Sequence, residues 1–416
     1  MKHFRKTAMI LAGLCAALTV GCGTDSVQTT VQAEAPAAAV QLKESAPKGG
    51  VLSQQTAFSL NLLQQTLALN EGQNVMVSPR SAALVLAMAA NGARGATLSD
   101  MEKALGGTPI AELNQFLSKQ QKKQTNKENA AKFTTANTIW FDESHAASEA
   151  FLKKNRDFFN AECFCAPFNS STVSDINQWC SDNTDGMIPQ LLDSIDPSAA
   201  MILINAAVFD GKWAEKYEPS DIKENAVFHA ASGEEKEVKL MCSFEDQYLE
   251  DENAVGFLRD YEGGKYAFAA LLPNEGIGAE EYIASLAPER LESVLANRTE
   301  RPVCAKIPAF SFCFDADLKK ALSAMGMASA FSPDADFSDM TETGEQLYIE
   351  EALLKTRIDV TEEGTRAAAV TAAAVSFGAS VLLETPIYVT LDRPFVFMIL
   401  DKDTNLPLFI GTLQTP

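Results

Sequence analysis

The sequence contains very little histidine, the side chain that most often transfers protons near neutral pH. Of the three histidines in 416 residues, His3 lies at the extreme N-terminus, and His145 and His229 lie in polar segments typical of surface positions. The sequence also lacks the G-x-S-x-G, P-loop, H-E-x-x-H and dinucleotide-binding glycine motifs. We therefore expect neither an enzyme nor a bound cofactor.

Metal-ligand patterns are missing too. Residues 401–405 begin like an EF-hand calcium loop, but Leu406 and Thr412 stand where that loop requires glycine and glutamate, which predicts a simple turn. No pair of the eight cysteines has the C-x-x-C spacing of metal or redox sites. We expect the cysteines beyond the N-terminus to be mainly buried thiols, with a disulfide left open. They are Cys163, Cys165, Cys180, Cys242, Cys304 and Cys313.

Basic residues are scarce relative to acidic ones. Lysine and arginine total 34 and aspartate and glutamate total 55, which gives a formal net charge of −21. Because phosphate binding needs clustered cations, we do not expect a nucleic-acid partner. The acidity suits a secreted protein that must stay soluble, and it favours encounters with basic partners.

The N-terminal apolar segment, residues 8–20, is too short to span a bilayer as a stable helix and follows three cations. This pattern predicts a signal peptide at residues 1–21. The segment ends in Leu-Thr-Val-Gly-Cys, which resembles a bacterial lipobox. We therefore expect an extracellular lipoprotein whose lipid on Cys22 holds it at the cell surface. The alternative is an ordinary signal peptide cut nearby, which would give a secreted protein.

Two regions of different composition follow. Residues 22–52 are poor in bulky apolar residues and rich in Ala, Thr and Pro, which predicts a flexible tether. Over residues 53–416 amphipathic helices come first and strands follow, without regular β–α alternation or repeats, which predicts a single α+β domain. Helices are expected at 53–70, 81–92 and 97–105, the last capped by Thr97, and strands at 201–209, 227–241, 302–314 and 347–360.

Eight short segments, taken together in their order and spacing, resemble the serpin family of serine protease inhibitors. They lie at residues 74–81, 176–179, 184–188, 205–213, 335–338, 362–365, 392–395 and 408–411. Each is weak alone, but together they extend over nearly all of residues 53–416. The resemblance implies a serpin fold, in which N-terminal helices surround a large mixed β-sheet and smaller sheets. It also implies an exposed reactive-centre loop near the C-terminus, at about residues 362–390.

The resemblance also assigns residues to roles. The hinge of the loop would comprise Glu362, Glu363, Gly364, Thr365, Ala367, Ala368 and Ala369. The shutter would comprise Ser78, Ser81 and Asn205, and the breach would contain Trp213. Leu354 stands where the family usually has a shutter histidine opposite Ser81 and Asn205, so the hydrogen-bond network there must differ.

The implied activity is suicide trapping, in which a serine protease attacks the loop, forms an acyl-enzyme, and the cleaved loop inserts as a strand into the large sheet. Side chains along a strand alternate between its two faces. If Thr365 faces inward, the inward set is small or β-branched throughout: Thr365, Ala367, Ala369, Thr371, Ala373 and Val375. Because non-inhibitory members tend to carry bulky, charged or proline residues there, we expect a monomeric inhibitor. A passive binding protein with this fold is the alternative.

Two bonds are candidates for cleavage. Counting from the hinge gives Gly378–Ala379, and counting back from Pro394 gives Leu383–Glu384. The surrounding window contains no lysine or arginine and comprises Val375, Ser376, Phe377, Ser380, Val381, Leu382 and Leu383. A trypsin-like target is therefore not expected, because its specificity pocket binds a cation. An elastase-like or chymotrypsin-like protease is expected, with subtilisin-like and cysteine proteases as alternatives.

Overall fold

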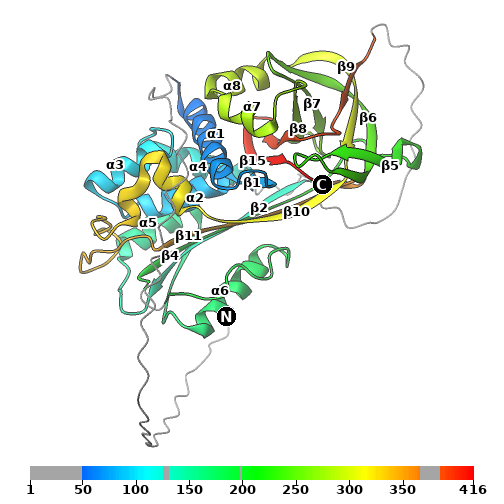
Figure 1. Cartoon of the computed structure of the whole chain (residues 1–416). Helices are drawn as coiled ribbons and strands as arrows, with labels where there is room; N and C mark the ends of the chain where they lie inside the picture. The colour runs from blue at the N-terminus through cyan, green and yellow to red at the C-terminus, as the bar shows by residue number, and fades with distance from the viewer. Residues whose placement is uncertain (1–48, 125–130, 197–198, 366–384) are drawn as a thin grey trace, which may run out of the picture. The chain divides into compact units, whose positions relative to one another are not determined.

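The computed structural model describes residues 49–124, 131–196, 199–365 and 385–416, which belong to one compact unit. Helices dominate the first part of the described chain and strands dominate the rest (Figure 1). The predicted α+β class is confirmed. None of the described helices is long and apolar enough to cross a membrane. Within the same residues, no cluster of His, Cys, Asp and Glu side chains could hold a metal ion.

The described helices agree with the predicted ones in place but not in every detail. They are α1 (Val51–Leu69), α2 (Pro79–Ala90), α3 (Gly95–Ala104), α4 (Ile110–Gln124), α5 (Glu149–Phe159), α6 (Ser170–Asn183), α7 (Ala279–Ser285), α8 (Pro288–Ala296) and α9 (Lys319–Leu322). Every residue of α2 is buried, as expected for a helix that is apolar on nearly all sides. Helix α1 begins directly after Gly50, two residues before the predicted start of the domain. The prediction that Thr97 caps α3 is wrong, because Thr97 lies inside the helix and its hydroxyl accepts the Asp336 amide at 2.9 Å.

The described strands form two sheets. A nine-stranded sheet has the order β1-β15-β14-β8-β7-β6-β9-β13, with β5 paired to β6, and a six-stranded sheet has the order β10-β11-β12-β4-β2-β3. The strands are β1 (Val75–Val77), β2 (Lys132–Asp142), β3 (Glu162–Ala166), β4 (Met201–Lys212), β5 (Ile222–His229), β6 (Glu235–Asp251), β7 (Ala254–Asp260), β8 (Tyr266–Pro273), β9 (Thr299–Pro308), β10 (Phe310–Asp317), β11 (Glu351–Thr361), β12 (Gly364–Thr365), β13 (Ile387–Thr390), β14 (Phe395–Asp401) and β15 (Leu406–Leu413).

Two predicted strands are each split into two. Residues 227–241 contain the end of β5 and the start of β6, which are joined by a turn at Gly233, whose φ of 83° suits glycine. Residues 302–314 contain parts of β9 and β10, which belong to different sheets because the chain leaves one sheet at Ala309 and enters the other. Apolar residues on both sides of each break made the pairs look continuous.

Strand β4 is buried on both faces, as its continuous apolar run predicts. Met201 and Leu203 belong to the core that contains α2, whereas Ile202 and Ile204 pack with Ile176 of α6. Figure 1 shows α6 on the opposite side of the six-stranded sheet from α2. Packing on both faces therefore holds β4 in place, so that a strand added beside it would have a fixed partner.

The six described cysteines are all free thiols. Of these six only Cys180 is buried; Cys163, Cys242 and Cys304 are partly buried, and the other two, Cys165 and Cys313, are exposed, so the expectation of mainly buried thiols is wrong. Both lie on edge strands of the six-stranded sheet, β3 and β10. An edge position depends on strand order, which the spacing of cysteines does not reveal.

Candidate functional site

Strands β4 and β11 run parallel and pair over six residues each, ending at Ala207 and Thr356. Beyond that pair the short strand β12 lies between them, antiparallel to both. Thr365 pairs with Gly211 on one side and with Val360 on the other. The chain that leaves β11 therefore turns back at once and enters the sheet between β11 and β4. We call the boundary between these two strands the seam.

Gly364 makes the close approach of β12 to β4 possible. Its φ of 152° lies in a region that L side chains rarely adopt. A Cβ atom on this residue would lie 2.2 Å from the carbonyl oxygen of Gly211. The glycine of the predicted hinge is therefore required by the geometry of the strand that follows β11.

Trp213 holds the turn that precedes Gly364. Its Nε1–H donates to the carbonyl of Thr361 at 2.9 Å, and its amide donates to the carbonyl of Glu363 at 3.2 Å. The indole is buried and stacks on Tyr261, with ring centroids 4.7 Å apart and planes at 9°. The structure therefore places Trp213 against the predicted hinge.

Tyr261 contacts the hinge residue that enters the sheet. Its hydroxyl lies 2.5 Å from Oγ1 of Thr365, and both side chains are buried. Burial raises the pKa of Tyr261 above its ordinary value, against the opposing effect of the hydrogen bond with Thr365. The phenol therefore stays protonated, and the side chain of Thr365 points into the protein.

A buried arginine supports the Trp213 ring. The guanidinium of Arg259 lies 5.1 Å from the centroid of Trp213 and 4.1 Å from that of Tyr217. It also forms an ion pair with Glu245 at 2.5 Å. Burial raises the pKa of Glu245, and the charge of Arg259 opposes that rise. Because cation–π attraction strengthens in dry surroundings, this cluster fixes the rings against which the hinge rests.

Glu362 fixes the outer side of the same turn. The Nζ atom of Lys239 lies 3.4 Å from Glu362 and 3.6 Å from Glu224. The pKa of Glu362 is lowered by a hydrogen bond from its own backbone amide and, against the effect of partial burial, by Lys239. An exposed pair of this kind adds little stability, but it orients the turn toward β6.

Two of the three predicted shutter residues, Ser81 and Asn205, meet at the paired part of the seam. Asn205 donates from Nδ2 to Oγ of Ser81 at 2.8 Å and to Oδ1 of Asn137 at 2.7 Å. Ser81 also donates to Oδ1 of Asn137, at 3.2 Å. Ser78 instead donates to the carbonyl of Leu408 on β15 at 2.8 Å. The structure therefore brings Ser81 and Asn205 together and places Ser78 apart from them.

Leu354 lies directly opposite Asn205 in the pairing of β11 with β4. Both residues are buried, and Oδ1 of Asn205 has no hydrogen-bond partner in the described part of the chain. The leucine side chain has no donor to offer. A buried acceptor without a partner costs about 1–3 kcal/mol, so the network is incomplete at the point where the seam is closed.

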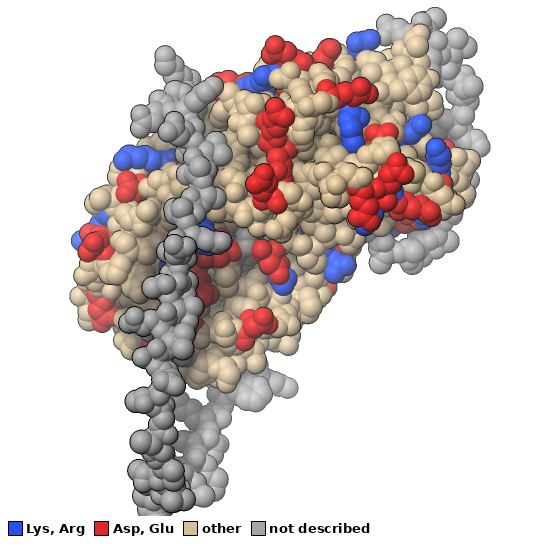
Figure 2. Space-filling model, in the orientation of Figure 1, with Lys and Arg blue, Asp and Glu red and all other residues tan. Residues whose placement is uncertain are grey.

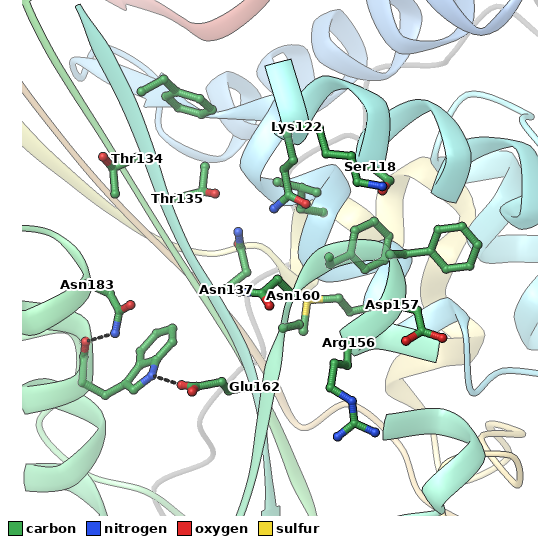
Figure 3. A pocket seen from close by; sticks show the side chains of 18 residues that line it. Ser118, Lys122, Thr134, Thr135, Asn137, Arg156, Asp157, Asn160, Glu162 and Asn183 are labelled. Atoms are coloured by element: carbon green, nitrogen blue, oxygen red, sulfur yellow. Dashed lines mark hydrogen bonds between the residues drawn. The ribbon is translucent and has the colours of Figure 1, made fainter. Parts of the chain in front are cut away.

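Asn137 also lines a cavity of about 690 Å³ between β2 and helices α4, α5 and α6 (Figure 3). Uncharged polar side chains such as Thr135 and Asn160 share its wall with apolar ones. On one side Glu162 accepts a hydrogen bond from the indole of Trp179 at 3.2 Å. Since Asn137 is only partly buried, one member of the shutter network faces this cavity.

Several predicted site residues lie outside the described residues. They are Cys22, Ala367, Ala368, Ala369 and both candidate bonds, Gly378–Ala379 and Leu383–Glu384, with the window 375–383. Three residues that shape the site were not predicted: Tyr261, Arg259 and Asn137. Tyr261 lies 104 residues from Thr365 along the chain, and no spacing in the sequence connects the two.

Comparisons with known proteins agree with one another. Residues 53–416 match the family model described as serpin (serine protease inhibitor). The leukocyte elastase inhibitor of Bos taurus is 32% identical over 381 residues, which cover 87% of this chain and 98% of that protein. The native structure of a thermophilic serpin, tengpin, matches with a TM-score of 0.83 at 40% identity. The match covers 90% of this chain and 96% of the tengpin chain. Thyroxine-binding globulin with thyroxine has a TM-score of 0.79 at 24% identity, over 88% and 100% of the two chains, which shows the fold alone.

Proposed function

The chain belongs to the serpin family, and on this premise we propose that it inhibits a serine protease by suicide-substrate trapping. The serine hydroxyl of the protease would attack a carbonyl carbon in residues 375–384 and form an acyl-enzyme. The peptide C–N bond would break, and the new amine would leave with a proton supplied by the protease. The cleaved loop would then enter the six-stranded sheet as a strand between β4 and β11.

The register of β12 carries this proposal. Thr365 pairs with Gly211 of β4 and with Val360 of β11. The difference between these two residue numbers is the same as in every direct pair between β4 and β11, so β12 does not change the register of its two neighbours. A strand that continued from Thr365 would therefore stay in phase with both neighbours. It would end with residue 374 opposite Ile202 and Glu351, where the seam begins. Roughly ten additional hydrogen bonds at about 1 kcal/mol each would favour the inserted state by about 10 kcal/mol.

The same register supports the expected alternation of faces. Since the side chain of Thr365 is buried, the inward set on insertion would be the small and β-branched one. In this set Thr371 would stand between Asn205 and Leu354, because these two pair directly now. Its hydroxyl would donate to Oδ1 of Asn205, the acceptor that has no partner while the seam is closed.

An elastase-like target agrees best with the composition of the window, and the likeness to a leukocyte elastase inhibitor supports it. A chymotrypsin-like protease is the next candidate, because Phe377 and Leu383 suit its pocket. Acidic side chains gather in several groups on the face seen in Figure 2, whereas basic ones are scattered. This charge would favour encounter with a basic protease.

We further propose that the protein acts outside the cytoplasm as a monomer attached to a membrane through a lipid on Cys22. The signal-like N-terminus and the apolar-poor segment 22–52 support this placement. Metabolic labelling with a radioactive fatty acid would test it. The label should be incorporated into the wild-type protein and be absent from a Cys22→Ser variant. Equal labelling of the two proteins would contradict the attachment of a lipid to Cys22.

The function is tested by mixing the protein with elastase and chymotrypsin and boiling the products in SDS. A covalent complex should survive with one of them, and mass spectrometry of the released C-terminal fragment should identify the cleaved bond. Clean cleavage without a complex would instead favour a passive binding protein, as would a cleaved form no more heat-stable than the intact one.

A further inference from the structure

Two large apolar side chains are exposed on one face of the nine-stranded sheet. Phe244 on β6 is 65% exposed and Tyr388 on β13 is 68% exposed. Cys304 on β9 lies between them, because it pairs with Phe244 on one side and with Tyr388 on the other. Residues paired across strands share a face of the sheet. These three residues therefore form a continuous row, which we call the aromatic row.

Charged side chains of both signs lie near the aromatic row. Lys306 belongs to the adjacent cross-strand set of Cys242, Lys306 and Thr390, and Asp221 and Lys223 lie close enough to Cys242 to interact with it. The opposite face of the same strands is buried, as Val303 and Val389 show. Aromatic side chains are enriched at protein interfaces, and exposed apolar surface of this kind commonly marks a contact site.

We propose that the aromatic row is a second contact surface for the target protease, beside the reactive-centre loop; this inference rests on the proposed function. The candidate bonds lie five and ten residues before Tyr388. The chain therefore separates Tyr388 from the attacked residue by at most about 18 or 36 Å. A protease domain of about 200 residues has a radius of gyration of roughly 16 Å. A protease seated on the loop thus extends over the row.

The aromatic row selects a partner of particular chemistry. It would contact an apolar patch beside the active-site cleft of the protease, because the two exposed rings bury apolar surface and offer no counter-ion of their own to a charged patch. The acidity of the whole chain acts at longer range and speeds encounter. The row lies outside the inserting segment, so its loss should slow association and leave trapping unchanged.

The test uses the protease that forms the covalent complex with the wild-type protein. The double variant Phe244→Ser/Tyr388→Ser should lower the second-order rate constant of complex formation about tenfold. The number of inhibitor molecules consumed per complex and the heat stability gained on loop cleavage should stay the same. Leu69→Ser is the matched control, because it removes another exposed apolar side chain, 43% exposed, from α1.

Two further measurements make the outcome decisive. Phe244→Tyr/Tyr388→Phe keeps both rings and should keep the wild-type rate. A protease whose nucleophilic serine is replaced by alanine should bind the double serine variant about tenfold more weakly than it binds the wild type.

Three outcomes would contradict the proposal in different ways. If the double serine variant and the wild type have equal rates and equal binding, the role of the aromatic row is overturned but the proposed function is not, since the wild type still traps the protease. A wild type that forms no complex would overturn the proposed function and the row together. A wild-type dimer that the double serine variant abolishes in sedimentation would show that the row binds a second copy instead.

Discussion

The hydroxyl of Tyr261 lies 2.5 Å from Oγ1 of Thr365, and this contact holds Thr365, a residue of the predicted hinge, inside the six-stranded sheet. Tyr261 is in turn stacked on Trp213. Thr365 already pairs with both β4 and β11. Insertion of the cleaved loop would therefore extend a strand, β12, that already lies between β4 and β11. To let the rest of the loop enter, the six residue pairs between β4 and β11 would have to separate.

Replacing Tyr261 by phenylalanine tests its hydroxyl contact with Thr365. The ring would keep its stacking on Trp213, but the buried hydroxyl of Thr365 would lose its partner. We expect the free energy of unfolding of the intact protein to fall by about 1–2 kcal/mol in denaturant titration. Tyr248→Phe, at another buried tyrosine, is the control and should change it by less. Equal effects of the two variants would contradict a specific role of the Tyr261 hydroxyl.

Replacing Thr365 by arginine tests loop insertion. The guanidinium would have to enter the buried site beside Tyr261, at a cost of several kcal/mol. The variant should be cleaved as a substrate at an undiminished rate and should form little SDS-stable complex on gels. Thr365→Ser keeps the hydroxyl and should still inhibit. Full inhibition by the arginine variant would show that inhibition does not depend on a buried side chain at position 365.

Replacing Thr371 by valine tests the register of the inserted strand. The two side chains have nearly the same shape, but valine has no donor for Oδ1 of Asn205. The cleaved form should lose about 1 kcal/mol of stability in guanidinium titration, and the intact form should stay within about 0.5 kcal/mol of the wild type. Thr371→Ser should behave as the wild type in both forms. An equal loss in both forms would mean that residue 371 does not meet Asn205 on insertion.

Local patterns in the sequence predicted the position of several helices and strands, but not where every strand is interrupted. The apolar run of β4 and the small residues of α2 predict burial directly, because each depends only on its own segment. The two breaks within predicted strands and the Tyr261–Thr365 contact depend on which strands become neighbours. Strand order is a long-range property, and nothing near Tyr261 indicates it. The same holds for Asn137, which joins the shutter network only because β2 pairs with β4.

The lowered pKa of Glu362 predicts a pH dependence at the predicted hinge, because the backbone amide of Glu362 and, to a lesser extent, Lys239 favour the ionised carboxylate. The pKa of Glu362 lies below its ordinary value of 4.5 in the folded protein. Because a depressed carboxyl pKa favours the folded state only when the group is ionised, this stabilisation is present above about pH 4.5 and disappears as the pH falls further. The pair of Glu362 and Lys239 is only partly buried and remains accessible to water, so its contribution is at most about 1 kcal/mol. Glu362→Gln should therefore lower the unfolding midpoint by a small amount at pH 7 and by less at pH 3, in scans at both values. Glu224→Gln is the control, since it removes the other carboxylate near Lys239 but leaves the turn intact. A Glu362→Gln effect of the same size at both pH values would show that the side chain acts through packing and not through its charge.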